Sequence, residues 1–466
     1  MMESDPATIE QIEPMPEDLE DFREIHEVAK KKLFTKPFCN VLVSAVVMCL
    51  VYSAFFPGGG LLDVVITDGM NTTHSSDVGF LSQSLTFASS IPVALITPFV
   101  INTIGIRATM GISSILYSGL FIGIIFMKTW TIYLGSVITG VGMGLTWVVM
   151  PKVFTDNSTM ENLQRNNTIW WCIYMMSMVI GNTADYLYLG TLTTIDADTR
   201  LYIYLICCAF TVAASLVGVI GYRNLNETAE ATQELENYIS SKSIDSHRVM
   251  ESDSAWERMK LSAARYKVTL LRREVGLLFT LLIYIAVVQA FYTMTFQTCI
   301  GNTFTDRSLI TLMGLVLGVT EVACCPILGL VCEKISNKVI VIFMFLSALA
   351  SFYLTFLIFP AAASYREAMG EETFIKPQKY LVLLIAVLLG ISDAGFNIIL
   401  NSLIGRLFQS DSEIGFMLLN AVMSSSSAVV FLISPYVSLY ALLGAEAILC
   451  TMATICVTMD LFRIGK

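Results

Sequence analysis

Four acidic residues stand at least five residues inside long apolar stretches of the sequence, where a charged side chain is costly. They are Asp185, Glu321, Asp393 and Glu446. On insertion scales an ionised residue at the centre of a membrane span costs roughly 2.5–3.5 kcal/mol, so such residues are rare and commonly serve ion or proton pathways. Apart from Lys338, the first residue of its stretch, no Lys, Arg or His falls within these stretches, so each acid must be protonated, hydrogen-bonded or bound to a cation. This pattern favours a proton or cation ligand over an anionic substrate.

Asp393 is the strongest candidate for such a site. Asn397 and Asn401 follow it by one and two helical turns, so a polar strip lies on or near one face of a helix. The strip either lines a central cavity or holds neighbouring helices together through hydrogen bonds. Glu321 is the second candidate for a protonatable switch, whereas Glu446 lies near the end of its stretch and is predicted to be structural.

Further polar and aromatic residues could complete a cavity. Asp185 follows Gly181-Asn182 by one turn and is the matching candidate in the first half of the chain, although hydration near the outer end of its stretch explains it equally well. Side chains of the kind that line a central cleft are Trp147, Trp170, Trp171, Tyr174, Tyr292 and Gln297. For Trp170 an anchoring role at the membrane interface is the favoured alternative.

The sequence carries no arrangement typical of an enzyme. Gly140-x-Gly142-x-Gly144 follows no strand and lies within an apolar stretch, so it is not a nucleotide-binding loop. Its spacing, like those of Gly119-x-x-x-Gly123 and Gly314-x-x-x-Gly318, predicts close helix packing. The eleven cysteines show neither a zinc spacing with histidine nor a disulfide framework. We therefore expect no catalytic residue, no cofactor and no metal.

The composition indicates an integral membrane protein. Of 466 residues, 55% are hydrophobic and only 14% are charged, against roughly 25% in soluble domains, and the mean hydropathy is +0.68. This excludes a disordered chain, a nucleic-acid-binding module and a secreted disulfide scaffold. Continuously apolar stretches of ~20 residues predict membrane-spanning helices. Twelve such stretches occur, at 39–57, 79–101, 108–127, 131–151, 168–190, 201–222, 276–298, 308–332, 338–360, 380–404, 413–434 and 437–461.

A polar segment divides these stretches into two sets of six. The predicted organisation is an acidic tail at 1–38, a six-helix half at 39–222, a linker at 223–274 and a second six-helix half at 275–466. Ten acids against Arg23 in residues 1–28 account for −9 of the formal net charge of −10. The membrane body is therefore nearly neutral, and the net charge says nothing about a substrate. Residues 17–36 fit either a surface helix or a solvated tail.

Lysine and arginine are unevenly distributed between the two sides of the predicted bundle. Twenty-two of the 28 fall on the side that holds both termini, which predicts that both termini are cytoplasmic. Of the four Asn-x-Ser/Thr motifs, only Asn71 then lies outside, where it is the expected glycosylation site. The sequence does not distinguish the plasma membrane from an internal membrane.

The turn after the eighth stretch contains Gly329, Glu333, Lys334 and Lys338. It resembles the turn motif of major facilitator superfamily transporters, in which such residues cap a helix and hold one arrangement of the two halves. The matching turn after the second stretch has Asn102 in place of the acid and is predicted to be an ordinary loop.

Short passages along most of the chain resemble the UNC-93-like branch of this superfamily, most closely its major facilitator domain-containing protein eleven type. They are Leu95-Ile-Thr-Pro98, Arg165-Asn-x-x-Ile169-x-Trp171, Gly181-Asn182, Thr298-Cys-Ile-Gly301, Ile375-Lys-Pro377 and Gly390-x-x-Asp393-x-x-Phe396-Asn397. The resemblance implies an all-α membrane protein with two pseudo-symmetric six-helix halves around a central cavity. It implies function less narrowly, because the branch includes potassium-channel regulators, trafficking partners of receptors and members without an established substrate.

Two functions are therefore expected from one scaffold. The first is a solute transporter whose halves rock about the cavity while intramembrane acids bind a proton or cation. Its candidate residues are Asp393, Glu321, Asn397, Asp185, Tyr292 and Gln297. The second is a non-transporting partner that sets the activity or trafficking of a potassium channel or another membrane protein. Both functions require the lipid bilayer, and neither involves nucleic acid.

Overall fold

The computed structural model describes the membrane-embedded part of the chain as helices. The described residues are 36–60, 62, 65–66, 75–159, 162–189, 197–223, 273–306, 308–332, 337–407 and 412–464. Almost all of the predicted acidic tail and linker lies outside these ranges. Asn71, Glu333 and Lys334 lie outside them as well, so the glycosylation site and half of the turn motif stay predictions.

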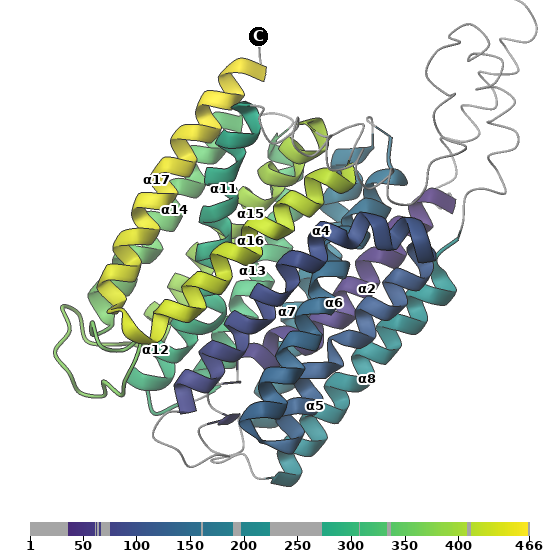
Figure 1. Cartoon of the computed structure of the whole chain (residues 1–466). Helices are drawn as coiled ribbons and strands as arrows, with labels where there is room; N and C mark the ends of the chain where they lie inside the picture. The colour runs from purple at the N-terminus through teal and green to yellow at the C-terminus, as the bar shows by residue number, and fades with distance from the viewer. Residues whose placement is uncertain are drawn as a thin grey trace, which may run out of the picture.

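The helices form two sets that lie side by side (Figure 1). The first set comprises α2 (Lys36–Gly60), α4 (Ser75–Leu116), α5 (Ser118–Phe126), α6 (Thr129–Asp156), α7 (Leu163–Leu189) and α8 (Ala197–Gly221). The second comprises α11 (Arg273–Ala290), the π-helix η2 (Phe291–Thr295), α12 (Phe296–Thr303), α13 (Ser308–Cys332), α14 (Asn337–Ile358), α15 (Lys379–Leu407), α16 (Ser412–Ile433), the 3₁₀-helix η3 (Ser434–Tyr436) and α17 (Leu439–Ile464). We call the side on which α2 begins and α17 ends the terminal face, and the other side the opposite face.

The helix α4 consists of two segments that run in opposite directions. They meet at Gly105, whose φ of 82° lies in the left-handed region that glycine adopts without strain. From Gly140 to Gly144 of α6, the contacting residue of the first segment changes from Thr86 to Ser90, so the numbers rise on both helices. From Gly135 to Gly142 of α6, the contacting residue changes from Gly119 in α5 to Ser113 in the second segment, so the numbers fall as those of α6 rise. The chain therefore reverses at Gly105.

Ten of the described helices are long and apolar enough to cross a membrane. One of these, Val78–Phe126, has 49 residues, and a straight helix of that length would extend roughly 74 Å, far beyond the ~30 Å hydrocarbon core. The reversal at Gly105 resolves this excess. α7 is not among the ten, because polar side chains interrupt its apolar sequence. Each of the twelve predicted stretches is helical over nearly all of its described length.

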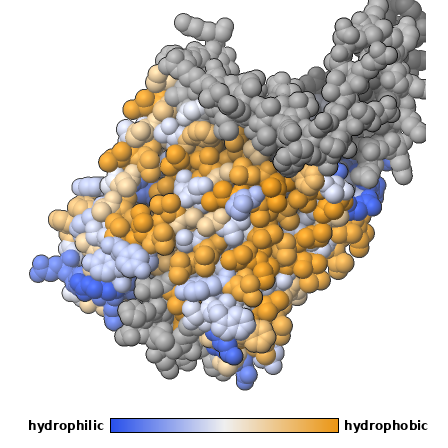
Figure 2. Space-filling model, viewed as in Figure 1, coloured by the Kyte–Doolittle hydropathy of each residue, from blue (hydrophilic) through white to orange (hydrophobic). Residues whose placement is uncertain are grey.

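The outer surface of the bundle is apolar. Hydrophobic side chains cover most of the face seen in Figure 2, and hydrophilic ones gather toward its edges. Large exposed hydrophobic residues include Ile206 on α8, Phe343 on α14 and Ile448 on α17. Such a continuous apolar surface suits lipid and not water. The prediction of an all-α, multi-pass membrane protein is confirmed.

The two halves meet through two pairs of helices, α4 with α16 and α7 with α13. In the first pair the Ser84 hydroxyl donates to the carbonyl of Ala428 over 2.9 Å. In the second pair Gly314 lies against Asn182, and a Cβ at this glycine would come within 2.5 Å of the amide oxygen. The close packing predicted from the Gly314-x-x-x-Gly318 spacing is confirmed. Between these two pairs the halves enclose a cavity.

Candidate functional site

The central cavity lies between the halves, and the empty space along its walls amounts to about 850 Å³ with open solvent included. Its aromatic lining consists of Tyr52, Phe55, Phe56, Phe87, Trp147, Tyr174, Tyr292 and Phe431. Its polar lining consists of Gln83, Gln289, Thr293, Asn420, Ser424 and Ser427. None of the described lining residues carries a charge. The cavity therefore suits a small solute with both apolar and hydrogen-bonding groups.

Aromatic rings of the first half form one wall of the cavity. The ring of Tyr52 on α2 lies 5.8 Å from that of Trp147 on α6 and 5.1 Å from that of Tyr174 on α7. The Trp147 indole N–H donates to the Tyr52 hydroxyl, which lies 3.1 Å from the hydroxyl of Tyr117. These edge-to-face contacts fix the orientation of the rings. The wall presents an ordered aromatic surface to the cavity.

Asp393 lies one side chain behind the opposite wall. Its carboxylate accepts hydrogen bonds from the Tyr292 hydroxyl over 3.2 Å and from the Gln289 amide over 3.4 Å. Both donors line the cavity, whereas Asp393 itself is 4% exposed and Glu321 is fully buried. The structure thus brings together Asp393, Glu321 and Tyr292, three of the site residues that the sequence proposes separately. The acids reach the cavity through Tyr292 and Gln289.

Glu321 on α13 lies close to Asp393 on α15. A hydrogen bond between two carboxyl groups requires a proton on one of them, because two ionised carboxylates only accept. No described donor reaches either oxygen of Glu321, whereas Asp393 already accepts two hydrogen bonds. A proton on Glu321 would supply the donor that its surroundings lack and would leave Asp393 as the acceptor of the bonds from Tyr292 and Gln289.

The helices that carry the acids approach closely one turn away from them. A Cβ at Gly390 on α15 would lie 2.9 Å from the carbonyl of Leu317 on α13. Glycine at this position lets the two backbones come near enough for short acidic side chains to meet. The Gly390-x-x-Asp393 spacing therefore places the acid beside Glu321.

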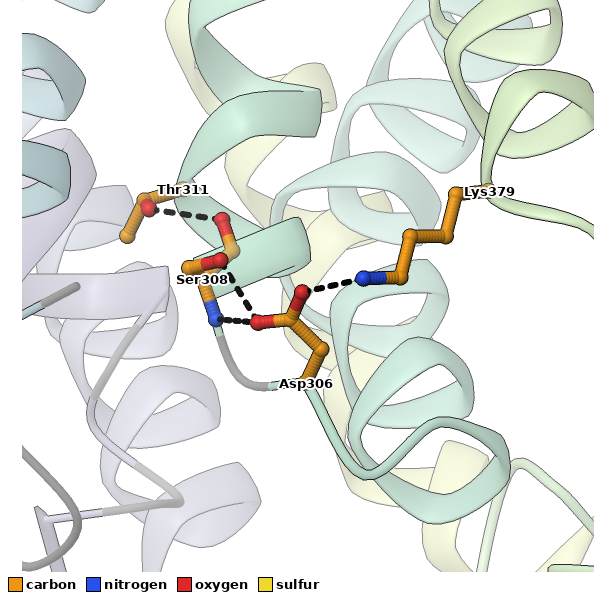
Figure 3. Close-up of polar contacts among 4 residues, drawn as sticks. All are labelled: Asp306, Ser308, Thr311 and Lys379. Atoms are coloured by element: carbon orange, nitrogen blue, oxygen red, sulfur yellow. Dashed lines mark hydrogen bonds and ion pairs between the residues drawn. The ribbon is translucent and has the colours of Figure 1, made fainter.

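An ion pair sets the register of the same two helices at the opposite face (Figure 3). Asp306 binds the Lys379 ammonium over 2.5 Å and accepts bonds from the backbone N–H and hydroxyl of Ser308. Ser308 begins α13 and Lys379 begins α15. Glu321 lies 13 residues beyond the first and Asp393 lies 14 residues beyond the second, or about 20 Å along each helix. The ion pair therefore joins the starts of the two helices, and the nearly equal spacings place the two acids at a similar depth.

The contribution of this ion pair is expected to depend on pH. The Lys379 ammonium and then the Ser308 hydroxyl hold the pKa of Asp306 below its ordinary value. A lowered pKa means that the stabilisation is complete above the unfolded value of about 3.9 and is lost as pH falls through the folded value. Because Asp306 is 37% exposed and Lys379 60% exposed, solvent limits the effect to about 1 kcal/mol or less.

Thermal unfolding of the wild type and Asp306→Asn measures this dependence. The wild type should unfold at a slightly higher temperature near neutral pH, and the difference should vanish below the folded pKa. Lys379→Gln should show the same loss near neutral pH. A difference that persists at strongly acidic pH would show that the ion pair is not its source.

Three other predicted site residues lie outside the cavity lining. The Asn397 amide donates to the backbone carbonyl of Asp393 over 2.9 Å, so it supports the acid from within the helix. Gln297 is buried in α12, and Asp185 lies beside Tyr204 of α8. The structure therefore does not bring Asp185 or Gln297 to the central cavity.

Trp170 is a core residue. Its side chain is 1% exposed, and the indole N–H donates to the Ser44 hydroxyl of α2 over 3.0 Å. The interface-anchor interpretation of this residue is therefore wrong. Trp170 also packs against Phe154, which lies 6.0 Å from Phe416 between the ends of α6 and α16. This cluster lies between the cavity and the terminal face.

Sequence reasoning missed a chain of hydrogen bonds that crosses the cavity wall. The Ser90 hydroxyl of α4 donates to Ser424 of α16 over 2.7 Å, and Ser424 donates to the amide oxygen of Asn420 over 3.0 Å. The Asn420 amide in turn donates to the carbonyl of Gly144 in α6 over 3.3 Å. The run of four serines at 424–427 was the available signal. Gln289, three residues before Tyr292, was missed as well.

Two residues of the turn motif lie within described helices. Gly329 lies in α13 and Lys338 in α14, and the residues between Cys332 and Asn337 fall outside the described ranges. Among the residues that the structure describes, no three His, Cys, Asp or Glu side chains cluster in a way that could hold a metal ion.

The chain is similar in sequence to one family of membrane proteins. The sequence model described as "Ion channel regulatory protein UNC-93" matches residues 71–458. The UNC93-like protein MFSD11 of Xenopus tropicalis is 28% identical over 416 residues, covering 87% of this chain and 92% of the relative. The protein of the same name from Xenopus laevis is 29% identical over 417 residues, with the same coverage.

Solved structures of transporters share the fold. The partially occluded, inward-open xylose transporter XylE from E. coli superposes with a TM-score of 0.64 at 12% identity, covering 91% of this chain and 96% of that one. A D-xylose-proton symporter gives 0.62 at 12% identity, covering 91% and 97%. A POT family transporter in complex with a thioalcohol-conjugated peptide gives 0.57 at 13% identity, covering 91% and 96%. At these identities the likeness is one of fold alone.

Proposed function

Because this chain belongs to the UNC-93 family and has the fold of major facilitator transporters, we propose that it carries a small solute through the central cavity, coupled to a proton at Glu321 and Asp393. One observation supports this most directly. Two neighbouring buried acids stand one side chain behind the wall of an uncharged cavity between two halves. We propose no enzymatic activity.

In this proposal Tyr292 and Gln289 connect the acids to the solute. Each uses its donor on Asp393 while its side chain also borders the cavity. A second proton on the pair would neutralise Asp393 and weaken its hold on both donors, because an ionised acceptor binds more strongly than a neutral one. The released donors could then bond the solute. Proton binding and solute binding would thereby affect each other, as coupling requires.

Proteoliposomes that contain the full-length protein and a trapped pH-sensitive dye test the proposal. Sugars, amino acids and organic amines are added singly, and proton movement is followed after each addition. The expected result is a proton flux that depends on one solute class and on the presence of protein. Absence of both solute uptake and proton flux across the whole set would overturn the proposal.

A second candidate function is regulation of an ion channel, and the printed description of the matching family favours it. In that case the chain would bind a channel within the bilayer and would transport nothing. Purification in a mild detergent followed by mass spectrometry tests this function. Co-purification of a channel subunit in stoichiometric amount, together with the absence of solute uptake and proton flux in proteoliposomes, would favour this function over transport.

We propose that both termini are cytoplasmic, as the distribution of lysine and arginine predicts. Asn71 is then external, and a glycan on it is expected. Expression in eukaryotic cells should yield a protein whose gel mobility increases after glycosidase treatment, and Asn71→Gln should remove this shift. Asn157→Gln is the matched control and should leave it in place. A glycan on Asn157 would invert the proposed orientation.

A further inference from the structure

A second pocket opens on the lipid-facing side of the second half. It has an empty volume of about 920 Å³ and lies between α11 with η2, α16 and α17. Its mouth is formed by exposed residues, among them Val429 at 56% and Ile433 at 40% exposed. It is distinct from the central cavity, since the two share no described lining residue. Its walls are mostly apolar, so it is open to molecules dissolved in the bilayer.

The carboxyl group of Glu446 lines this pocket. Glu446 is 2% exposed, and its Oε2 has no hydrogen-bond partner among the described residues. It lies seven residues into α17, about 10 Å from the helix end at the opposite face. The sequence predicts only a structural role for Glu446. The spacing of residues along one helix does not reveal a pocket that forms between three helices.

The other polar groups of the pocket are already occupied. The hydroxyls of Ser425, Ser426 and Ser434 donate to backbone carbonyls of their own helix over 2.6–2.9 Å. Among the described residues, the titratable neighbours of Glu446 are Tyr284 of α11 and Cys450 of α17, and neither carries a positive charge. Because no described side chain supplies a cation, the acceptor oxygen of Glu446 suits a ligand that carries a positive charge itself.

We propose that this pocket binds a lipophilic amine that enters from the membrane, with its ammonium group on Glu446 and its alkyl chain along the apolar walls. An ammonium supplies both the charge and the N–H donors that the carboxylate lacks. The depth of Glu446 suits such a ligand, because the amine stays near the interface while its chain lies in the hydrocarbon core. The proposal does not depend on transport through the central cavity.

Photolabelling of the full-length protein in lipid nanodiscs tests this site. The probe is hexadecylamine that carries a diazirine near its amino end, and the matched probe is the corresponding hexadecanol. The amine is expected to label segments 425–434 and 442–449 about tenfold more than the alcohol does, the difference typical of a charge-assisted hydrogen bond. Glu446→Gln should remove this preference while the thermal unfolding temperature stays within the range of the wild type.

Two further variants make the outcome decisive. Ala445→Phe fills the mouth of the pocket and leaves the carboxyl in place, so it should also abolish amine labelling. Glu372→Gln removes an exposed acid at the opposite face and should leave the labelling by both probes unchanged.

Two outcomes would show that the pocket is an ordinary lipid contact. They are equal labelling by amine and alcohol, and undiminished amine labelling of Glu446→Gln. Absence of labelling in the wild type would favour occupation by a neighbouring protein helix and would overturn the proposal.

Discussion

Asp393→Asn is expected to lower proton-coupled solute movement about a hundredfold, which corresponds to the roughly 3 kcal/mol of a charged hydrogen-bonding group. The substitution removes the negative charge that holds Tyr292 and Gln289. It keeps the shape of the side chain, and the new amide can donate to Glu321, whose oxygens have no described donor. The fold should therefore be preserved. Solute-dependent proton flux into proteoliposomes and thermal unfolding measure the two effects separately.

Glu321→Gln provides the matched comparison. Glutamine donates permanently to Asp393 and so mimics the protonated state of Glu321. Solute exchange across the liposome membrane should continue in this variant, whereas net proton flux should disappear. Wild-type proton flux in both variants would exclude the acid pair as the coupling site.

Gly140→Ala is expected to destabilise the protein by about 1–3 kcal/mol, as overpacking of a close helix contact does. A Cβ at this position would lie 2.2 Å from the carbonyl of Thr86 and still closer to the Ser89 hydroxyl. The carbonyl belongs to the backbone of α4, so α4 and α6 would have to separate. A lower thermal unfolding temperature of the purified protein should report the change.

Gly444→Ala is the control for this prediction. Gly444 also lies within a helix, but a Cβ there meets no atom within 4 Å. Alanine is the better helix former by about 1 kcal/mol, so this variant should unfold at the wild-type temperature or slightly above it. If both variants behaved alike, helix propensity and not helix contact would explain the result.

The sequence predicts the helices well because a membrane span is a local property. Glu321 and Asp393 are marked as functional candidates by the free-energy cost of placing an ionisable side chain within an apolar stretch. Their mutual contact could not be predicted, because it joins residues on separate helices and depends on the close approach at Gly390. That Asp185 and Gln297 do not line the central cavity could not be predicted either. An apolar stretch gives little indication of which side of its helix faces the cavity.

The error at Trp170 has a similar cause. Tryptophan near a helix end is typical of the membrane interface, but Ser44 on α2 offers a buried acceptor for its N–H. The polar residues Asn420 and Ser424 were missed because serine and asparagine in spans often bond only within their own helix. Here they connect α16 to both α4 and α6.

The origin of the groups around Asp393 has a consequence for any motion of the halves. Glu321, Gln289 and Tyr292 all belong to the second half, as Asp393 does, so a rigid-body rotation of that half carries the whole proton-sharing group along unchanged. Tyr174 belongs to the first half and lines the same cavity as Tyr292 and Gln289. A rotation would therefore change the position of its phenol relative to the two donors that bind Asp393. Proton binding would then be communicated to the first half through contacts at the cavity wall.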